Sequence, residues 1–291
     1  MTDGIGDGPE IIHGDCIDVM LGMGDDSVDS IVTDPPYGLG FMGKEWDKLP
    51  PGQDWAEECL RVLKPCGYLL AFGGTRTWHR LAVAIEDAGF EIRDSIAWMH
   101  SQGFPKNNAT LKAAFEPVVV ARKPLKGTLE NNKAVYGTGE YVIDAARIPS
   151  DDDTSRPQGK SIRGANYGPG GFGQRSTIRT GGGDGGRWPA NVVLDEAQAN
   201  RLAESKFFYV AKPSKAERPS VGGVVHPSVK PLSLMRWLIR LVTPSGGVVL
   251  DTFAGSGATV EAAILEGFHC IAIEREAEYL LLIQQRIRRA A

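Results

Sequence analysis

The tetrapeptide Asp34-Pro35-Pro36-Tyr37 constrains this chain more than any other stretch of it. It follows the apolar run 28–33, which predicts a short buried strand. Each proline has a fixed φ and no N–H, so the turn is stiff and the Pro35 carbonyl stays free to meet a ligand. An exocyclic amino group has two N–H donors, which Asp34 and this carbonyl would accept, while Tyr37 offers a ring for stacking on a base. The alternative is an ordinary proline turn with a surface tyrosine.

A second turn, Phe253-Ala254-Gly255-Ser256-Gly257, lies between a predicted strand over 248–253 and a predicted helix. The next predicted strand ends at Glu274, about 20 residues after the turn, the spacing at which an acid binds ribose hydroxyls. Val260 occupies the place of the third glycine of the dinucleotide pattern. A nucleoside without phosphates is therefore the better ligand, and S-adenosylmethionine fits, with its ribose at Glu274 and its methionine part over 255–257.

Two further segments extend this predicted site. The predicted strand 10–13 runs into Asp15, at a position where open α/β sheets bind ligands, and Asp15 would accept from an adenine amino group or cap the next helix. Ser228 and Lys230 precede another predicted helix and are expected at the carboxylate of the cofactor. The alternative is an extended lead into the helix, with Pro231 at its first position and Lys230 in solvent.

The remaining patterns predict a doubly wound sheet. Helices that begin near Asp54 and Thr75 alternate with a strand at 67–73, and two consecutive strands at 90–99 and 117–121 indicate an antiparallel pair. In the last helix Arg286, Arg288 and Arg289 are expected to point outward, where cations suit the helix dipole.

The middle of the chain differs in composition. Residues 156–188 are rich in glycine and carry arginine, amide and aromatic side chains, a mixture that suits phosphate and base-edge contacts; the alternative is a flexible linker. A strand–helix–strand pattern resumes over 191–211. The loop 38–49 is long enough to close over a bound base. The residues predicted to contact DNA are Lys44, Trp46, Arg163, Asn166, Tyr167, Arg175, Arg179 and Arg187.

Composition sets limits on the partners. A net charge of −4 excludes a globally basic nucleic-acid binder, so any DNA site must be a local basic patch. The four cysteines form no CxxC pair, and we expect them to be reduced and buried, without a metal site. The sequence has no recognisable signal peptide, membrane-spanning run or lipidation motif, which predicts a cytosolic protein without a membrane partner.

Taken together, these motifs resemble those of the amino-directed DNA methyltransferases, which modify adenine N6 or cytosine N4. The proline motif comes first and the glycine motif last, an order that resembles the beta class of this family. The likeness covers residues 10–121 and 225–286, and the stretch 187–191 is similar to that of phage and actinobacterial members.

The resemblance implies a circularly permuted α/β fold with the mostly parallel, doubly wound sheet of class I S-adenosylmethionine-dependent methyltransferases. One catalytic half is expected over 1–123, an inserted target recognition domain over 124–224, and the cofactor-binding half over 225–291. The resemblance assigns Asp34, Pro35, Pro36 and Tyr37 to a flipped base. It assigns Asp15, Cys16, Asp34, Ser228, Lys230, Asp251, Phe253, Ala254, Gly255, Ser256, Gly257 and Glu274 to S-adenosylmethionine.

The expected reaction is therefore direct methyl transfer to an amino group of double-stranded DNA, with adenine favoured because Asp begins the tetrapeptide. Cytosine N4 is the first alternative. RNA or glutamine methylation, a non-catalytic DNA-binding partner with the same fold, and a dehydrogenase are the others. A homodimer, a cognate restriction endonuclease and a location at the nucleoid of a bacterial or phage-infected cell complete the expectations.

Overall fold

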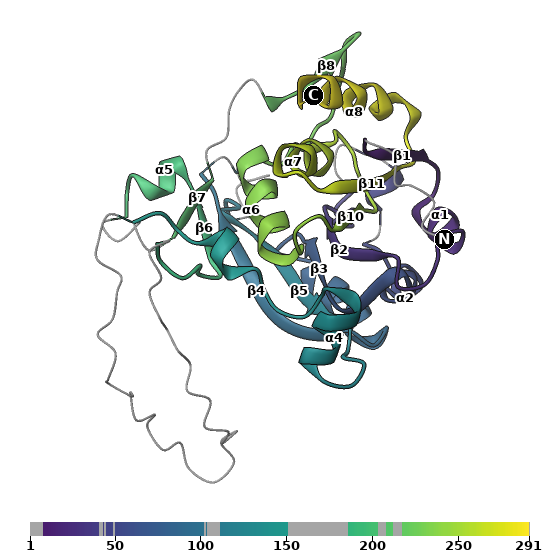
Figure 1. Cartoon of the computed structure of the whole chain (residues 1–291). Coiled ribbons are helices and arrows are strands. Elements are labelled where there is room, and N and C mark those ends of the chain that lie inside the picture. The colour runs from purple at the N-terminus through teal and green to yellow at the C-terminus, as the bar shows by residue number, and fades with distance from the viewer. Residues whose placement is uncertain are drawn as a thin grey trace.

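The computed structural model describes residues 8–40, 43, 45–48, 50–101, 103, 111–150, 186–202, 208–211 and 217–290. Within these ranges nine strands form one sheet through the middle of the molecule (Figure 1). From edge to edge they are β1 (Glu10–His13), β11 (His269–Glu274), β10 (Val248–Asp251), β2 (Val28–Thr33), β3 (Leu63–Phe72), β5 (Phe115–Arg122), β4 (Glu91–Met99), β6 (Val192–Asp195) and β7 (Tyr209–Ala211). A separate hairpin joins β8 (Ser220–Val221) to β9 (Val224–Val225).

Strand β5 runs against all the others. Its pairs with β3 and β4 are antiparallel, and every other neighbouring pair in the sheet is parallel. This confirms the predicted mostly parallel sheet with an antiparallel pair. Because β5 is reversed, its first residues lie at the same edge of the sheet as the carboxyl ends of β2 and β3.

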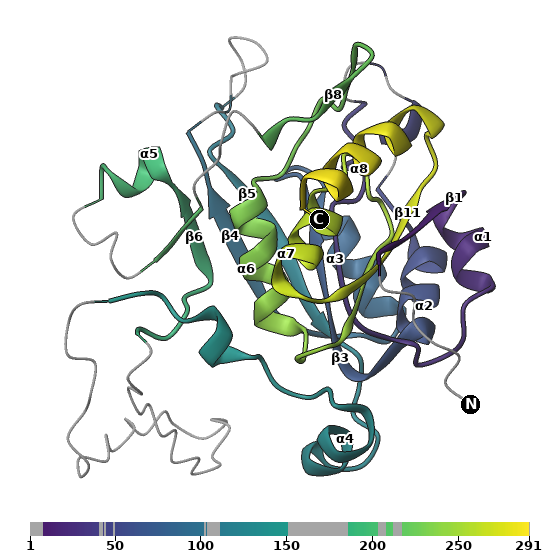
Figure 2. The ribbon, with the colours of Figure 1, turned by 45° about the horizontal axis from the view of Figure 1, so that its top comes forward.

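Helices cover both faces of the sheet (Figure 2). On one face lie α1 (Cys16–Leu21), α2 (Gln53–Val62) and α3 (Trp78–Asp87), and on the other lie α6 (Leu232–Val242), α7 (Ala258–Glu266) and α8 (Ala277–Ala290). The other helices are η2 (Glu45–Asp47), α4 (Leu129–Tyr136), η3 (Ile143–Ala146) and α5 (Glu196–Ala199).

The two cores follow from strand alternation. Side chains of a strand point to opposite faces of the sheet, so in β3 Leu70 and Phe72 pack with α6 and α7 while Leu69 and Ala71 pack with α2 and α3. All four are fully buried, as in a strand covered on both faces. The molecule is therefore a three-layer α/β structure.

Helix starts differ slightly from prediction. The helix α2 begins at Gln53 behind Gly52, so Asp54 lies in its first turn rather than at its cap. The helix α3 follows Thr77, not Thr75. The strand β3 begins at Leu63, directly after α2, and Pro65 lies in the stretch of β3 where its register with β2 shifts.

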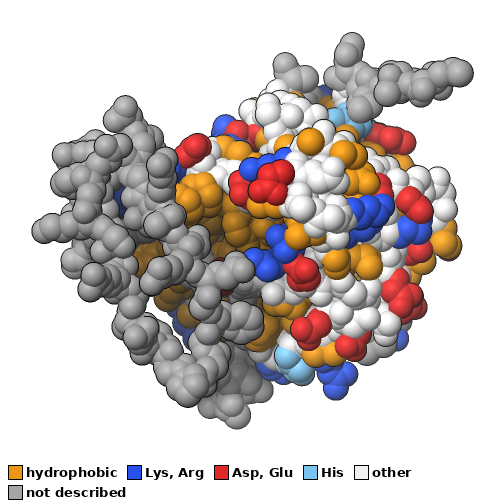
Figure 3. Space-filling view, turned by 60° about the horizontal axis from the view of Figure 1, so that its bottom comes forward, with side chains coloured by type: hydrophobic (Ala, Val, Ile, Leu, Met, Phe, Trp, Pro, Cys, Tyr) orange, Lys and Arg blue, Asp and Glu red, His pale blue; other side chains and the backbone are white. Residues whose placement is uncertain are grey.

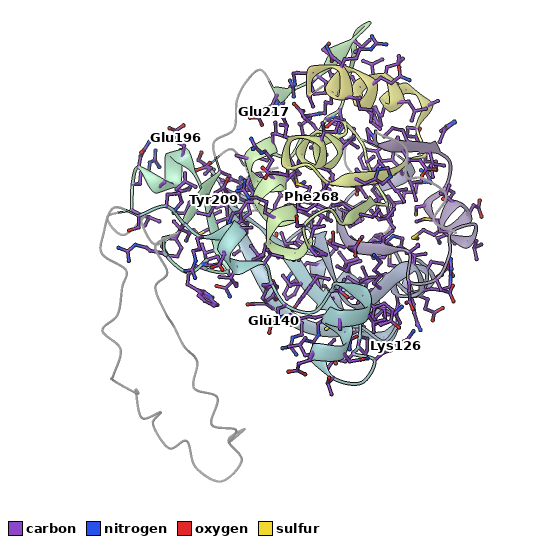
Figure 4. All side chains as sticks on the ribbon, viewed as in Figure 1. Lys126, Glu140, Glu196, Tyr209, Glu217 and Phe268 are labelled. Carbon is purple, nitrogen blue, oxygen red and sulfur yellow. The ribbon has the colours of Figure 1, made fainter. Side chains whose placement is uncertain are left out.

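Part of the segment 124–224 belongs to the main sheet. The strands β6 and β7 continue the sheet beyond β4, so the predicted antiparallel pair lies inside the sheet. Tyr209 fixes β7 to α6 (Figure 4): its hydroxyl donates to the Ser233 carbonyl at 3.1 Å, and its ring stacks on Trp237. The segment is thus not a separate unit over its whole length, because β6 and β7 lie on the main sheet.

The C-terminal helix corrects one prediction. Arg286 is 1% exposed, not outward, and its guanidinium forms an ion pair with Glu261 of α7 and donates to the Glu217 carbonyl at 2.8 Å. Arg289 also pairs with Glu261. Burial is possible because Glu261 supplies the compensating charge.

The surface of the described residues carries mixed charges on the face seen in Figure 3, where basic and acidic side chains are interspersed. No helix in the described ranges is long and apolar enough to cross a membrane. The four cysteines are free thiols and buried, as predicted.

Candidate active site

A cavity of about 350 Å³ opens where β1, β11, β10 and β2 end. Residues predicted from both ends of the chain line it: Asp15, Cys16, Asp34, Pro35, Pro36, Tyr37, Ser228, Lys230, Asp251, Phe253, Ala254, Gly255, Ser256 and Glu274. Parallel strands that finish at the same edge bring their following loops together, which is why distant segments meet here. The proline motif and the glycine motif share one cavity.

Four side chains form a charged network inside the cavity. The Lys230 ammonium lies 2.5 Å from Asp34 Oδ2 and 3.3 Å from Glu116 Oε2. The Tyr37 hydroxyl lies 2.9 Å from Asp34 Oδ1 and 2.8 Å from Glu116 Oε2. One lysine and one tyrosine therefore each bridge the same two carboxylates.

The protonation of this network follows from its charges. Burial by itself would lower the pKa of Lys230, but the charges of Asp34 and Glu116 raise it above its ordinary value. Burial would raise the pKa of Glu116, but Lys230 and the Tyr37 hydroxyl hold it below its usual range. Burial and the two carboxylates raise the pKa of Tyr37 well above its ordinary value. At neutral pH Lys230 is a cation, Glu116 an anion and Tyr37 a neutral hydroxyl.

Asp47 holds the loop after the proline motif. Its Oδ1 accepts from the backbone N–H groups of Tyr37 and Gly38 at 2.6 and 3.0 Å, and Oδ2 accepts from that of Leu39 at 3.3 Å. The side chain is 3% exposed. A buried carboxylate with three N–H donors fixes the path of the backbone that carries the Tyr37 ring.

The glycine turn is built around acidic side chains. Glu274 accepts from the N–H groups of Gly255 and Glu276 at 2.6 and 2.7 Å, and burial raises its pKa to about 7. Asp251 accepts from the Thr33 hydroxyl at 2.7 Å, and burial raises its pKa to about 6. Both carboxylates shape the turn as well as line the cavity.

His226 closes one side of the cavity. Its ring stacks at 6.2 Å on that of Trp46 and meets the edge of Tyr279 at 4.6 Å. A Cβ added to Gly255, whose φ is +53°, would lie 3.1 Å from His226 Nε2. The backbone can pass beneath this ring because residue 255 has no side chain.

Some predicted residues have a different or additional place. Gly257 lies outside the lining, and its φ of +80° forms the turn that starts α7. Asp15 caps α1 by accepting from the Ile17 N–H at 2.9 Å while it lines the cavity. Trp46, predicted to contact DNA, lies in the cavity wall. Burial raises the pKa of Cys16 to about 12, so its thiol is not ionised at neutral pH.

Lys44, Arg163, Asn166, Tyr167, Arg175 and Arg179 lie outside the described residues. Arg187 forms an isolated backbone bridge with Ile148. Its contact with DNA stays a prediction.

Sequence reasoning missed three residues of the network and its surroundings: Glu116, His100 and Asp47. A signal existed for Glu116, since 90–99 and 117–121 were predicted as an antiparallel pair and the start of a reversed strand lies at the edge where parallel strands end. His100, which follows β4, reaches this edge from the other side and lies 3.6 Å from Glu116. No local pattern marks Asp47, whose partners depend on the loop conformation.

Comparisons with known proteins identify the family of this chain. A family model described as DNA methylase, of the N6 and N4 amino-methyltransferases, matches residues 28–285. The type II methyltransferase M.HpaI of Haemophilus parainfluenzae is 25% identical over 285 residues, which cover 95% of this chain and 73% of M.HpaI.

Solved structures share the fold. A complex of M1.HpyAVI with SAM is 21% identical with a TM-score of 0.55, covering 95% of this chain and 98% of the other. The PvuII DNA methyltransferase, cytosine-N4-specific, is 16% identical with a TM-score of 0.57, covering 97% and 90%. These likenesses confirm the α/β sheet of class I methyltransferases. With the family match over most of its length, the chain belongs to the N6/N4 DNA methylase family of enzymes.

Proposed function

We propose that this chain transfers a methyl group from S-adenosylmethionine to adenine N6 of a base flipped out of double-stranded DNA. The observation that carries the proposal is the single cavity lined by Asp34 and Tyr37 on one side and by Gly255 and Glu274 on the other. A methyl donor and an amine must lie side by side for direct transfer. Adenine is favoured because aspartate begins the tetrapeptide.

The cavity suits the cofactor. Gly255 leaves room beneath His226 that a Cβ would fill, and the adjoining Phe253 and Ile273 offer apolar walls. The buried Glu274 carboxylate would accept from ribose hydroxyls, which favour its ionised form. S-adenosylmethionine, once bound, supplies an electrophilic methyl group on a positively charged sulfur. Asp15 and Ser228 lie in the same lining, within the space open to the nucleoside and the amino-acid tail.

Lys230 has a different proposed role from that expected. It was predicted at the cofactor carboxylate, but its ammonium is buried between Asp34 and Glu116. We assign it to holding the Asp34 carboxylate, with Ser228 left for the cofactor tail. The oriented Asp34 and the Pro35 carbonyl would accept the two amino hydrogens and direct the nitrogen lone pair at the methyl group. Extrusion of the base costs about a few kcal/mol, which stacking on Tyr37 offsets.

The test is sequencing of single DNA molecules from cells that lack their own methylation and express the wild-type chain or Asp34→Ala. We expect N6-methyladenine at one sequence motif with the wild type and none with the variant. Purified Asp34→Ala should still bind S-adenosylmethionine in calorimetry. N4-methylcytosine at a motif would instead identify cytosine N4 as the target of the reaction. Unmodified DNA from cells that express the folded wild-type chain would contradict the proposal.

We also propose partners and a cellular location for this chain. A target recognition role for part of 124–224, a homodimer, a cognate restriction endonuclease and a cytoplasmic, nucleoid-associated location rest on the family alone. DNA is the partner on which the proposed reaction depends.

A further inference from the structure

Glu116 is a second acidic residue in the network that holds the Asp34 carboxylate. The reaction proposed above gives it no role. It is the second residue of β5, the reversed strand, and lines the cavity within hydrogen-bond distance of the Tyr37 hydroxyl. Its side chain is 23% exposed. Even a partly buried acid in a ligand cavity costs free energy, so its contacts call for an explanation.

The Tyr37 hydroxyl links the two acids. Its oxygen is 2.9 Å from Asp34 Oδ1 and 2.8 Å from Glu116 Oε2, but it has one hydrogen to donate. When this hydrogen points at Glu116, the hydroxyl oxygen can accept a hydrogen from a protonated Asp34. The two carboxylates are thus connected by a group that accepts a proton on one side as it donates one on the other.

The far side of Glu116 faces a histidine. His100 Nε2 lies 3.6 Å from Glu116 Oε1, and His100 is 8% exposed. This nitrogen has no hydrogen-bond partner among the described residues. The groups around Glu116 are therefore Tyr37, Lys230 and His100.

The reaction must release a proton. As the amine nitrogen bonds to the methyl carbon, the carbon–sulfur bond breaks and its electron pair stays on sulfur. The nitrogen then carries a positive charge and must lose one of its two hydrogens as a proton. An aromatic amine in this state is far more acidic than a carboxylic acid, so a carboxylate accepts the proton.

We propose that this proton ends on Glu116, transferred from the amine to Asp34 and onward through the Tyr37 hydroxyl. The amine N–H bond breaks as the Asp34 O–H bond forms; Asp34 then gives this proton to the Tyr37 oxygen, and Tyr37 gives its own to Glu116 Oε2. The sum is one proton lost by the amine and one gained by Glu116, whose partly exposed carboxyl group gives it up to solvent before the next turnover. The inference rests on the proposed function.

The decisive variant is Glu116→Gln. An amide oxygen still accepts from Tyr37 and Lys230, so the hydrogen-bond geometry is kept while the ability to take a proton is lost. In single turnovers we expect a fall of about 100-fold in the rate of methyl transfer. The Kd for S-adenosylmethionine and the KM for DNA should stay within about twofold, since neither rests on a proton transfer. Glu116→Asp, which keeps an acid, should recover part of the rate.

Tyr37→Phe keeps the ring for stacking and removes only the hydroxyl. Its rate should fall as in Glu116→Gln, and the double variant should be no slower than the slower single variant, because both interrupt one path. Glu91→Gln is the matched control and should keep the wild-type rate. Glu91 pairs with Arg122 at the start of β4, the end of that strand away from the cavity. Without DNA or cofactor, the Tyr37 ring-carbon NMR signal should shift in Glu116→Gln and not in Glu91→Gln.

Two results would overturn the inference while the proposed function stands. One is a wild-type transfer rate in Glu116→Gln; the other is a double variant whose losses multiply. If the wild-type protein itself transfers no methyl group to DNA, the proposed function fails and the inference with it.

Discussion

Lys230 Nζ lies 2.5 Å from Asp34 Oδ2, although the two residues are 196 positions apart. This contact joins the segment before α6 to the end of β2. It also fixes the orientation of the carboxylate that the proposed reaction uses.

Lys230→Met should both destabilise and inactivate the protein. It leaves two acids without their cation, and removal of one partner of a buried ion pair costs about 3–5 kcal/mol. Since Asp34 and Glu116 keep 21% and 23% of their side chains exposed, we expect about 3 kcal/mol in urea unfolding. Lys133→Met breaks the exposed pair with Glu140 and should change the free energy of unfolding by less than about 1 kcal/mol. Equal effects of the two variants would contradict the role of Lys230.

Cofactor affinity should depend on pH through Glu274. Its pKa is raised by burial to about 7, and ribose hydroxyls bind the ionised form, so affinity should rise with pH until about 7 and then level off. Below that pH we expect a loss approaching tenfold per pH unit in calorimetry. Glu274→Gln should bind weakly without this dependence on pH. A wild-type affinity that is flat from pH 5.5 to 8 would refute the assignment.

The same shift affects folding with the opposite sign. The pKa of Glu274 rises from 4.5 in the unfolded chain to about 7 in the folded protein, so the folded state holds the proton more tightly. Its contribution to stability is full below pH 4.5 and is lost as pH rises through 7. The free energy of unfolding of the wild type minus that of Glu274→Gln, measured at pH 5 and at pH 8, gives this contribution at each pH.

Gly257→Ala should be more harmful than Gly267→Ala. Both glycines have positive φ, +80° and +73°, where a non-glycine residue costs about 1–2 kcal/mol. At 257 the added Cβ would also lie 3.1 Å from the Ile283 backbone, whereas at 267 nothing lies within 4 Å. Urea unfolding should show the larger loss for Gly257→Ala, and calorimetry a weaker cofactor affinity for it alone. Indistinguishable variants would mean that the close approach of α8 does not matter.

Asp47→Ala should slow methyl transfer without loss of cofactor binding. It removes the acceptor for three backbone N–H groups that fix Tyr37, and hydrogen bonds to a charged group contribute about 1.5–3 kcal/mol each. Asp47→Asn keeps one oxygen and should lose less activity. The measurements are single-turnover rates and calorimetry; a wild-type rate in Asp47→Ala would show that the loop holds its shape by other contacts.

Arg286→Met should destabilise by about 3 kcal/mol, because the buried Glu261 then keeps only the partly exposed Arg289 as its cation. Arg288→Met, on the exposed side of the same helix, should change stability by less than about 0.5 kcal/mol. Unfolding by urea compares the two.

Much of the fold and site followed from the sequence by itself. Local sterics and hydrophobic periodicity, which neighbouring residues determine, predict the buried strands, the stiff turn at Pro35 and Pro36, and the glycine turn before α7. β1 and β2 have the predicted bounds, 10–13 and 28–33, and parallel strands that end together bring Asp34 and Gly255 to one cavity.

Tertiary structure decided the roles of charged side chains. Arg286 falls three and four residues after Ile283 and Leu282 on the buried side of α8, and its charge is tolerated there because Glu261 of another helix faces it. Lys230 is buried because Asp34 and Glu116 face it. The strands β6 and β7 extend the sheet because β4, far away in the sequence, offers them an edge. Each of these outcomes depends on a partner far away in the chain, and the energy of a buried charge is set by that partner and not by its sequence neighbours.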